Sequence, residues 1–163
     1  MLSSSPLAIG LLSSSGVPLE ALGDWHPAPA GLREVVPQAS YWVEKQGEKL
    51  AALSLRYSMF RLLNAEKKSP GASTIFAVRS VPELEFNLRA LEPVFAQDVG
   101  DAVVGNESNQ KWNSVTINSA QLGRDEPLFN GVRERLGSWI DFTFTSPEST
   151  WVIQRKTTLP EVV

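Results

Sequence analysis

The sequence predicts an α/β fold, and three observations along its first hundred residues lead to that prediction. A short run of apolar residues and serines at residues 1–7 is typical of a strand. Two helical patterns follow at residues 32–45 and 49–63. A second strand at residues 73–78 then leads into a helix at residues 81–95. Strands that alternate with helices in this way indicate a parallel sheet covered by helices.

A long loop and two helices separate the predicted strands. Residues 12–31 are dense in Ser, Gly and Pro, a composition that predicts a loop. Apolar residues then recur at near-helical spacing from Leu32 to Val43, with Gly47 as a suitable stop and Pro37 as an argument against an unbroken first turn. The second helix has a broad apolar surface, and its cationic side chains are expected to stay in water: Lys49, Arg56 and Arg61.

The second strand and its helix meet at a clear boundary. Ser73 to Val78 is a nearly continuous apolar run, typical of a strand buried on both faces of a parallel sheet. Ser80 and Glu83 have the spacing of a capping box, and Pro82 stands in the first turn. Two parallel strands do not make an independent sheet, so either other strands are missing or the tail of the chain supplies them.

Composition excludes several classes of function. A hydrophobic share of 42% and a charged share of 20% indicate a globular chain. A net charge of -3 without runs of like charge argues against partners such as nucleic acid or an anionic membrane. Because the chain has no cysteine, it has no disulfide, thiolate metal site or cysteine nucleophile. The apolar start lacks a basic segment, so it reads as neither a signal peptide nor a membrane span, and a cytoplasmic location is expected.

Four segments resemble the aldo/keto reductase family. Residues 5–12, Ser-Pro-Leu-Ala-Ile-Gly-Leu-Leu, resemble the Ser-Pro-Leu-Gly-x-Gly-Leu-Leu pattern after that family's seventh strand. Residues 75–88, which include Val-Arg-Ser-Val-Pro-Glu-Leu, resemble its eighth strand and the following helix. Residues 24–29 and 53–58 resemble the branch that contains L-galactose dehydrogenase and D-arabinose 1-dehydrogenase. This resemblance, over roughly residues 2–91, implies a partial (β/α)8 TIM barrel made of its last two βα units.

The resemblance also implies a division of the chain. Residues 1–97 would be the C-terminal part of the barrel, from strand seven to helix eight, and residues 98–163 a C-terminal extension. The extension is expected to be partly irregular. An irregular segment, a helix ended by Gly137 and a β-hairpin are expected within it, at residues 101–123, 127–136 and 140–154.

The family's site residues carry over onto matching positions. The resemblance implies an NAD or NADP cofactor and an aldose substrate. Active sites of (β/α)8 barrels lie at the carboxyl ends of the strands, and helix N-termini there bind anions. His26 would contact the substrate. The cofactor's pyrophosphate and adenosine ends would be approached by two groups of residues, namely Ser5, Leu7 and Gly10, and Arg79, Ser80, Glu83 and Asn87.

The sequence departs from the family pattern at several of these positions. Ala8 and Ala77 stand where the family commonly has glycine, and a methyl group at a close approach obstructs backbone contacts. Phe86 replaces the family's glutamate. The Glu83 carboxylate would repel a 2′-phosphate that Arg79 would attract, and the balance leans to NAD.

The family's catalytic Asp, Tyr, Lys and His lie on strands one to four, outside this chain, so we assign no catalytic residue. We also assign no metal site. We expect a C-terminal fragment of an NAD(P)-dependent aldo/keto reductase that carries part of the cofactor site. A truncated coding sequence would produce such a fragment. Cofactor binding by this chain alone, and whether it is an enzyme at all, stay open.

Each assigned residue also has a simpler interpretation. The Ser5 to Gly10 segment can be an ordinary strand-to-loop turn, and His26 a residue of loop packing. Arg79 and Ser80 can be a strand end and a helix cap, and Asn87 an exposed helix residue. The alternative function is a non-catalytic module that pairs its exposed barrel edge with another chain, including a second copy.

Overall fold

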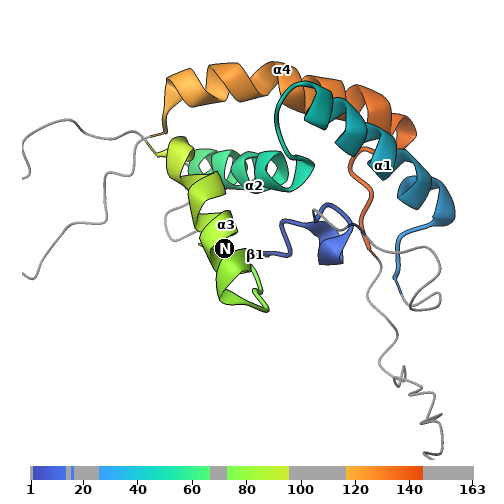
Figure 1. The fold of residues 1–163 in the computed structure, drawn as a ribbon, viewed down its shortest axis with the longest axis horizontal. Helices are drawn as coiled ribbons and strands as arrows, with labels where there is room; N and C mark the ends of the chain where they lie inside the picture. Colours follow the sequence, from blue (N-terminus) through green and yellow to red (C-terminus); the bar gives the residue numbers. More distant parts are fainter. Residues whose placement is uncertain (1, 14–15, 17–25, 67–72, 96–116, 145–163) are drawn as a thin grey trace, which may run out of the picture.

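A computed structural model describes residues 2–13, 16, 26–66, 73–95 and 117–144 (Figure 1). Within these ranges the protein is mostly helical, with two three-residue strands. The elements, in chain order, are β1 (Leu2–Ser4), η1 (Ala8–Gly10), α1 (Ala30–Lys45), α2 (Leu50–Glu66), β2 (Ser73–Ile75), α3 (Val81–Leu91), η2 (Glu92–Val94), α4 (Ser119–Leu136) and η4 (Gly137–Trp139), where η marks a single 3-10 turn.

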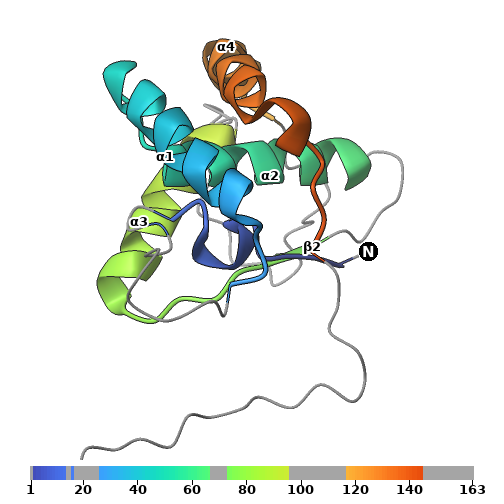
Figure 2. The ribbon, with the colours of Figure 1, turned by 90° about the vertical axis from the view of Figure 1, so that its right-hand side faces the viewer.

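The two strands are parallel and adjacent, as the order of the elements predicts. Their register pairs Leu2 with Ser73 and Ser4 with Ile75. Figure 2 shows these strands beneath α2, with α1 and α4 above it. Both strands are shorter than predicted, since β1 ends at Ser4 and β2 at Ile75.

α2 is the central helix, and apolar side chains surround it. Leu50 and Leu53 pack in a cluster with the buried stripe of α1, which includes Leu32 and Val36. Leu55 packs on the opposite side, in a cluster with residues of α3. A helix that is apolar on several sides is a core helix, which explains why its sequence shows only a broad apolar surface.

α1 confirms the predicted helix and contains Pro37. Its buried residues are Leu32, Val36, Ala39 and Val43, spaced to lie along one face. Pro37 lies in the helix on the exposed side, so the lost backbone hydrogen bond faces water. Gly47 follows the helix with a φ of 82°, a conformation that favours glycine.

α4 starts earlier than predicted. The segment up to residue 123 was expected to be irregular, but the helix begins at Ser119 and continues through Pro127. The side chain of Asn118 accepts a hydrogen bond of 3.1 Å from the backbone N–H of Gln121, which caps the helix. Gly137 follows the helix as predicted, with a φ of 53°. Residues 101–116 lie outside the described residues.

Two tryptophans pack between α1 and the segment formed by α4 and η4. The ring of Trp42 lies directly on Gly131, where a Cβ atom would overlap it. The ring of Trp139 lies on Gly31, where a Cβ atom would be 2.8 Å away. The guanidinium of Arg135 covers Trp42 at 4.1 Å from the ring centroid. Each tryptophan ring therefore packs closely against a glycine of the other segment, where no side chain separates the ring from the backbone.

A buried ion pair joins α2 to α4. Arg56 donates from Nε to Asp125 Oδ2 at 2.7 Å and from Nη2 to Asp125 Oδ1 at 2.9 Å. The two residues are 4% and 1% exposed, so the expectation that Arg56 stays in water was wrong. Gln121 donates to Asp125 at 3.0 Å, and Glu48 lies 3.1 Å from Arg56.

This environment fixes the charge of Arg56. Burial disfavours the charged guanidinium, but the hydrogen bonds and negative charges of Asp125 and Glu48 outweigh burial and raise the pKa of Arg56 above its ordinary value. Arg56 therefore stays protonated, and its fork holds the carboxylate of Asp125 in a bidentate geometry. α4 is thus tied to the core by a charged contact as well as by packing.

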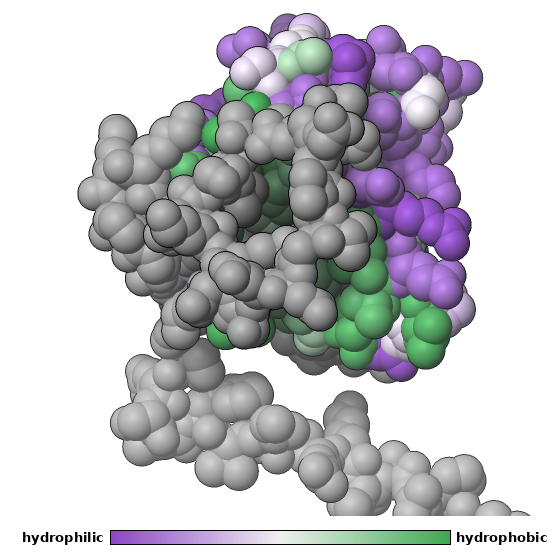
Figure 3. Space-filling view, turned by 90° about the vertical axis from the view of Figure 1, so that its left-hand side faces the viewer, coloured by the Kyte–Doolittle hydropathy of each residue, from purple (hydrophilic) through white to green (hydrophobic). Residues whose placement is uncertain are grey.

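The strand side of the molecule carries exposed apolar groups. The second strand was expected to be buried on both faces, but Ile75 is 56% exposed and Val78 is 38% exposed. Val81, Leu84 and Leu88 of α3 are also exposed, on one face of the helix. The physical reason is that, among the described residues, β1 is the only strand beside β2. On the face drawn in Figure 3, apolar side chains are open at the lower right beside hydrophilic surface.

Two further predictions differ from the structure or lie outside it. The helix predicted over residues 81–95 is α3 followed by the single turn η2. Residues 140–144, predicted as one strand of a hairpin, form no strand, because the chain makes a turn there in which Asp141 has a φ of 61°. The second strand of that hairpin, at residues 151–154, lies outside the described residues.

Candidate functional site

The segments after β1 and β2 leave the sheet at the same edge. The strands run parallel, and Ser5 N–H donates to Ile75 O at 3.2 Å, which extends their pairing by one bond. The loop from Ser5 to Gly10 and the segment that leads to Arg79 therefore start side by side. The carboxyl edge of parallel strands is where α/β proteins bind ligands.

The loop after β1 is folded through unusual backbone conformations. Ser5, Ala8, Ile9 and Gly10 have φ angles of 55°, 50°, 58° and 91°. Only glycine adopts this left-handed region freely, and each other residue costs about 1–2 kcal/mol there. Hydrogen bonds such as Ala8 N–H to Ser5 O, 2.8 Å, hold the loop. The φ of Ala8 gives a physical reason for the glycine that the family commonly has at this position.

His26 is buried against this loop, next to Ala8. It is 3% exposed, and its Nδ1 accepts a hydrogen bond of 3.0 Å from Ala28 N–H. Nε2 therefore carries the proton and points it at Ala8 O, 3.4 Å away. Phe144 meets the ring edge to face at 5.7 Å between centroids. This placement agrees with the loop-packing interpretation, while a contact between His26 and substrate stays a prediction.

Ser80 caps the start of α3 as predicted, but Glu83 bonds to the residue before the cap and so does not complete the capping box. Ser80 Oγ accepts from Glu83 N–H at 3.3 Å, and Glu83 Oε2 accepts from Arg79 N–H at 2.8 Å. Glu83 also lies 3.9 Å from Arg79 Nε. The Arg79 side chain is 88% exposed, so its guanidinium is open to a bound anion. At this helix end Arg79 would attract an anion, while the Glu83 carboxylate would oppose it.

Two of the predicted cofactor residues point inward. Asn87 is 2% exposed, so neither the exposed-residue interpretation nor an open contact with a nucleotide describes it in this structure. Leu7 packs against the cluster of Leu55 and Leu91 between α2 and α3. The strand register thus starts the segments with Ser5 and Arg79 at adjacent strand ends, while Leu7 and Asn87 lie toward the interior.

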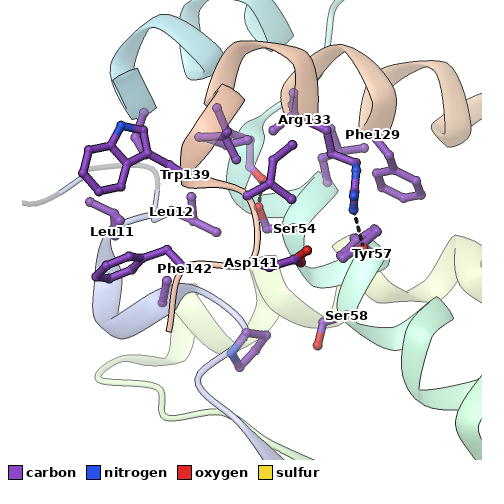
Figure 4. A pocket seen from close by; sticks show the side chains of 18 of the residues that line it. Leu11, Leu12, Ser54, Tyr57, Ser58, Phe129, Arg133, Trp139, Asp141 and Phe142 are labelled. Carbon is purple, nitrogen blue, oxygen red and sulfur yellow. Dashed lines mark hydrogen bonds between the residues drawn. The ribbon is translucent and has the colours of Figure 1, made fainter. Parts of the chain in front are cut away.

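A cavity that sequence reasoning missed lies on the other side of the loop. Its volume is about 580 Å³, and Pro6 and Ala8 of the loop form part of its wall. The rest of the wall comes from Leu11 and Leu12, from α1, α2 and α4, and from η4 with the segment after it (Figure 4). Tyr57 and Arg61 stand four residues apart, as do Phe129 and Arg133, and this paired spacing was the available signal. The signal is weak because the sequence predicts only the part of α4 from residue 127 onward.

No membrane-spanning helix and no metal site are found in the described part of the chain. None of the helices described is both long and apolar enough to cross a bilayer. Within the same ranges, no group of three His, Cys, Asp or Glu residues is placed to hold a metal ion.

Comparison with known proteins supports the resemblance. No family model matches the chain. Over 91 residues the chain is 33% identical to L-galactose dehydrogenase of Arabidopsis thaliana, an alignment that covers 56% of this chain and 25% of that protein. The resemblance to the aldo/keto reductases, and to this branch of the family, is confirmed. The chain spans about a quarter of the length of the curated relative it matches.

Proposed function

We propose that this chain is the C-terminal part of an NAD(P)-dependent aldo/keto reductase that oxidises or reduces an aldose. Residues 1–97 would supply the last two βα units of a (β/α)8 barrel, and residues 98–163 a C-terminal extension. The observation that carries the proposal is the parallel pairing of β1 with β2, which starts both family motifs at one sheet edge. A cytoplasmic setting, which is reducing, suits a chain without cysteine.

The residues present fit the adenosine diphosphate end of the cofactor. The exposed guanidinium of Arg79 and the positive end of the α3 dipole would attract phosphate oxygens. The loop from Ser5 to Gly10 would meet the pyrophosphate, with Leu7 and Asn87 supporting the two segments from within. The nicotinamide, when bound, supplies or accepts the hydride. The chain holds no residue that matches the catalytic tetrad, so by itself it is expected to bind nucleotide without turnover.

Glu83 favours NAD over NADP in this proposal. Its carboxylate lies 3.9 Å from Arg79 Nε and offsets part of the positive charge that a 2′-phosphate would need. Replacing Glu83 by glutamine would remove that opposition. The Glu83→Gln chain is therefore expected to gain affinity for NADP, while its affinity for NAD stays nearly the same.

Isothermal titration of the chain with ADP, NAD and NADP tests the proposal. Arg79→Gln is expected to weaken ADP and NAD binding roughly fivefold, because it removes one charge-assisted contact with phosphate. Arg89→Gln is the matched control, since Arg89 is an exposed arginine of α3 with its own glutamate partner, Glu85, at 3.3 Å. Equal losses in both variants, or no nucleotide binding at all, would argue against a cofactor site here. Cofactor-dependent oxidation of D-arabinose or L-galactose by the pure chain would contradict the expected lack of turnover.

A second candidate is an interaction module that docks its strand side on another chain. The exposed apolar groups Ile75, Val81 and Leu88, at 56%, 68% and 55% exposure, favour it. Size-exclusion chromatography with light scattering measures the association. Val81→Lys is expected to reduce it, and a monodisperse monomer of the unaltered chain would count heavily against this candidate.

A further inference from the structure

The cavity between α2 and α4 combines an apolar floor with cationic groups at its side. Leu11, Leu32, Leu50 and Leu53 contribute to the floor, and all four are buried in one core cluster. A volume of about 580 Å³ is in the range of small-molecule sites, which are about 300–1,000 Å³ and mostly apolar. An apolar floor of this size accommodates a hydrocarbon chain or a ring.

Two guanidinium groups of this wall have no acidic partner among the described residues. Arg61 of α2 and Arg133 of α4 line the cavity, and neither forms an ion pair with any residue in the described ranges. By contrast, Arg56, Arg79 and Arg89 each have a carboxylate within 4.0 Å. Cationic groups left unpaired beside an apolar cavity favour a ligand that brings a negative charge.

Tyr57 joins the two helices at the polar end of the cavity. Arg133 donates from Nη1 to Tyr57 Oη at 3.4 Å, as the dashed line in Figure 4 shows. Tyr57 is oriented by Phe129, whose ring meets it edge to face at 5.0 Å between centroids. Because its oxygen accepts from Arg133, its own proton is available to a ligand. Arg133 and Tyr57 thus offer two donors to one carboxylate.

We propose that this cavity binds an amphipathic monocarboxylate, such as a medium-chain fatty acid. The carboxylate would lie between Arg133, Arg61 and Tyr57, and the hydrocarbon would lie against the leucine floor. The lining contains Asp141, an exposed acidic residue, which limits the net positive charge of the lining to one. A single negative charge on the ligand balances that value. This site uses none of the proposed nucleotide residues, so its test is independent of the test of the proposed function.

Isothermal titration of the full chain with octanoate tests the site. A dissociation constant on the order of 0.1 mM is expected for a ligand with so few atoms. Octylamine has the same tail with a positive head, and butyrate has the same head with a short tail, and both are expected to bind at least about tenfold more weakly. Equal affinity for octanoate and octylamine would overturn the role of the two arginines.

Variants locate the binding. Arg133→Gln is expected to weaken octanoate binding about five- to tenfold, and Asp141→Asn to strengthen it about two- to fivefold, because each changes the charge beside the carboxylate. Val132→Trp would fill the cavity and abolish binding while the helical circular dichroism is kept. Arg135→Gln, on the same helix but directed at Trp42, is the matched control and is expected to bind as the unaltered chain does.

Three outcomes would reject the proposal. Octanoate that does not bind would show that the cavity is not a site for an amphipathic monocarboxylate. Binding that Arg135→Gln weakens as much as Arg133→Gln would indicate a nonspecific charge effect. Binding that Val132→Trp leaves unchanged would move the ligand elsewhere.

Discussion

α2 has α1 and α4 on one side and α3 with the two strands on the other, and the two sides are built differently. On the first side, tryptophan rings sit on glycines and a buried arginine holds a buried aspartate. On the second side, the two three-residue strands pair only with each other in the part of the chain that the structure describes, and Ile75 and Val81 are exposed. The difference indicates that the helical side is held by close packing and a buried ion pair, whereas the strand side leaves apolar side chains on its surface.

The largest effect is expected from breaking the helical side at Asp125. Asp125→Ala leaves the buried guanidinium of Arg56 with Glu48 as its remaining acidic partner, and should lower the free energy of unfolding by about 3 kcal/mol. Urea unfolding followed by circular dichroism measures it. Glu85→Ala removes an exposed pair on α3 and is expected to cost no more than about 0.5 kcal/mol. Equal losses would show that burial of the Arg56–Asp125 pair contributes nothing.

Two glycines of α4 offer a comparison within one helix. Gly131→Ala would push a methyl group into the ring of Trp42 and should destabilise the fold by about 1–3 kcal/mol. Gly123→Ala meets no atom within 4 Å and should stabilise it by about 0.5–1 kcal/mol, because alanine favours the helix. Thermal unfolding of both variants decides the matter. A change in stability of the same sign in both variants would mean that Trp42 is not closely packed on Gly131.

The smallest effect is expected at the loop of the strand side. Ala8→Gly relieves a left-handed alanine but loses a partly buried methyl group and adds freedom to the unfolded chain. We expect a net gain of about 0.5 kcal/mol in urea unfolding. Ala120→Gly, the same change in the first turn of α4, should cost up to about 1 kcal/mol. A loss at Ala8 as large as that at Ala120 would mean that the loop is not strained.

Local signals predicted most of the helices. The capping residue Ser80 and the glycine after α1 are readable because each acts on its own segment. The sequence does not indicate the start of α4, because its cap, Asn118, lies in a polar stretch and Pro127 is typical of a first helical turn. The helix accommodates Pro127 on an exposed face.

The rest depends on contacts between distant residues. Arg56 and Asp125 are 69 positions apart, and nothing near either residue in the sequence indicates that they meet. The predicted cofactor residues came from motifs, and the strand register explains why two of those motifs lie together. The paired spacing on α2 and on α4 is visible in the sequence, but it does not indicate the cavity, because the wall combines segments that are far apart along the chain. Exposure of β2 likewise depends on which strands stand beside it rather than on its own residues.

The ring of His26 gives the proposed site a built-in spectroscopic reporter. It is the only histidine in the sequence, and its Nε2 faces Ala8 O in the strained loop. An NMR spectrum of a chain labelled with ¹⁵N at histidine would therefore contain one imidazole, with no assignment needed. A nucleotide that reorders the loop would shift that single Nε2 resonance, whereas a ligand held only at α3 would leave it in place.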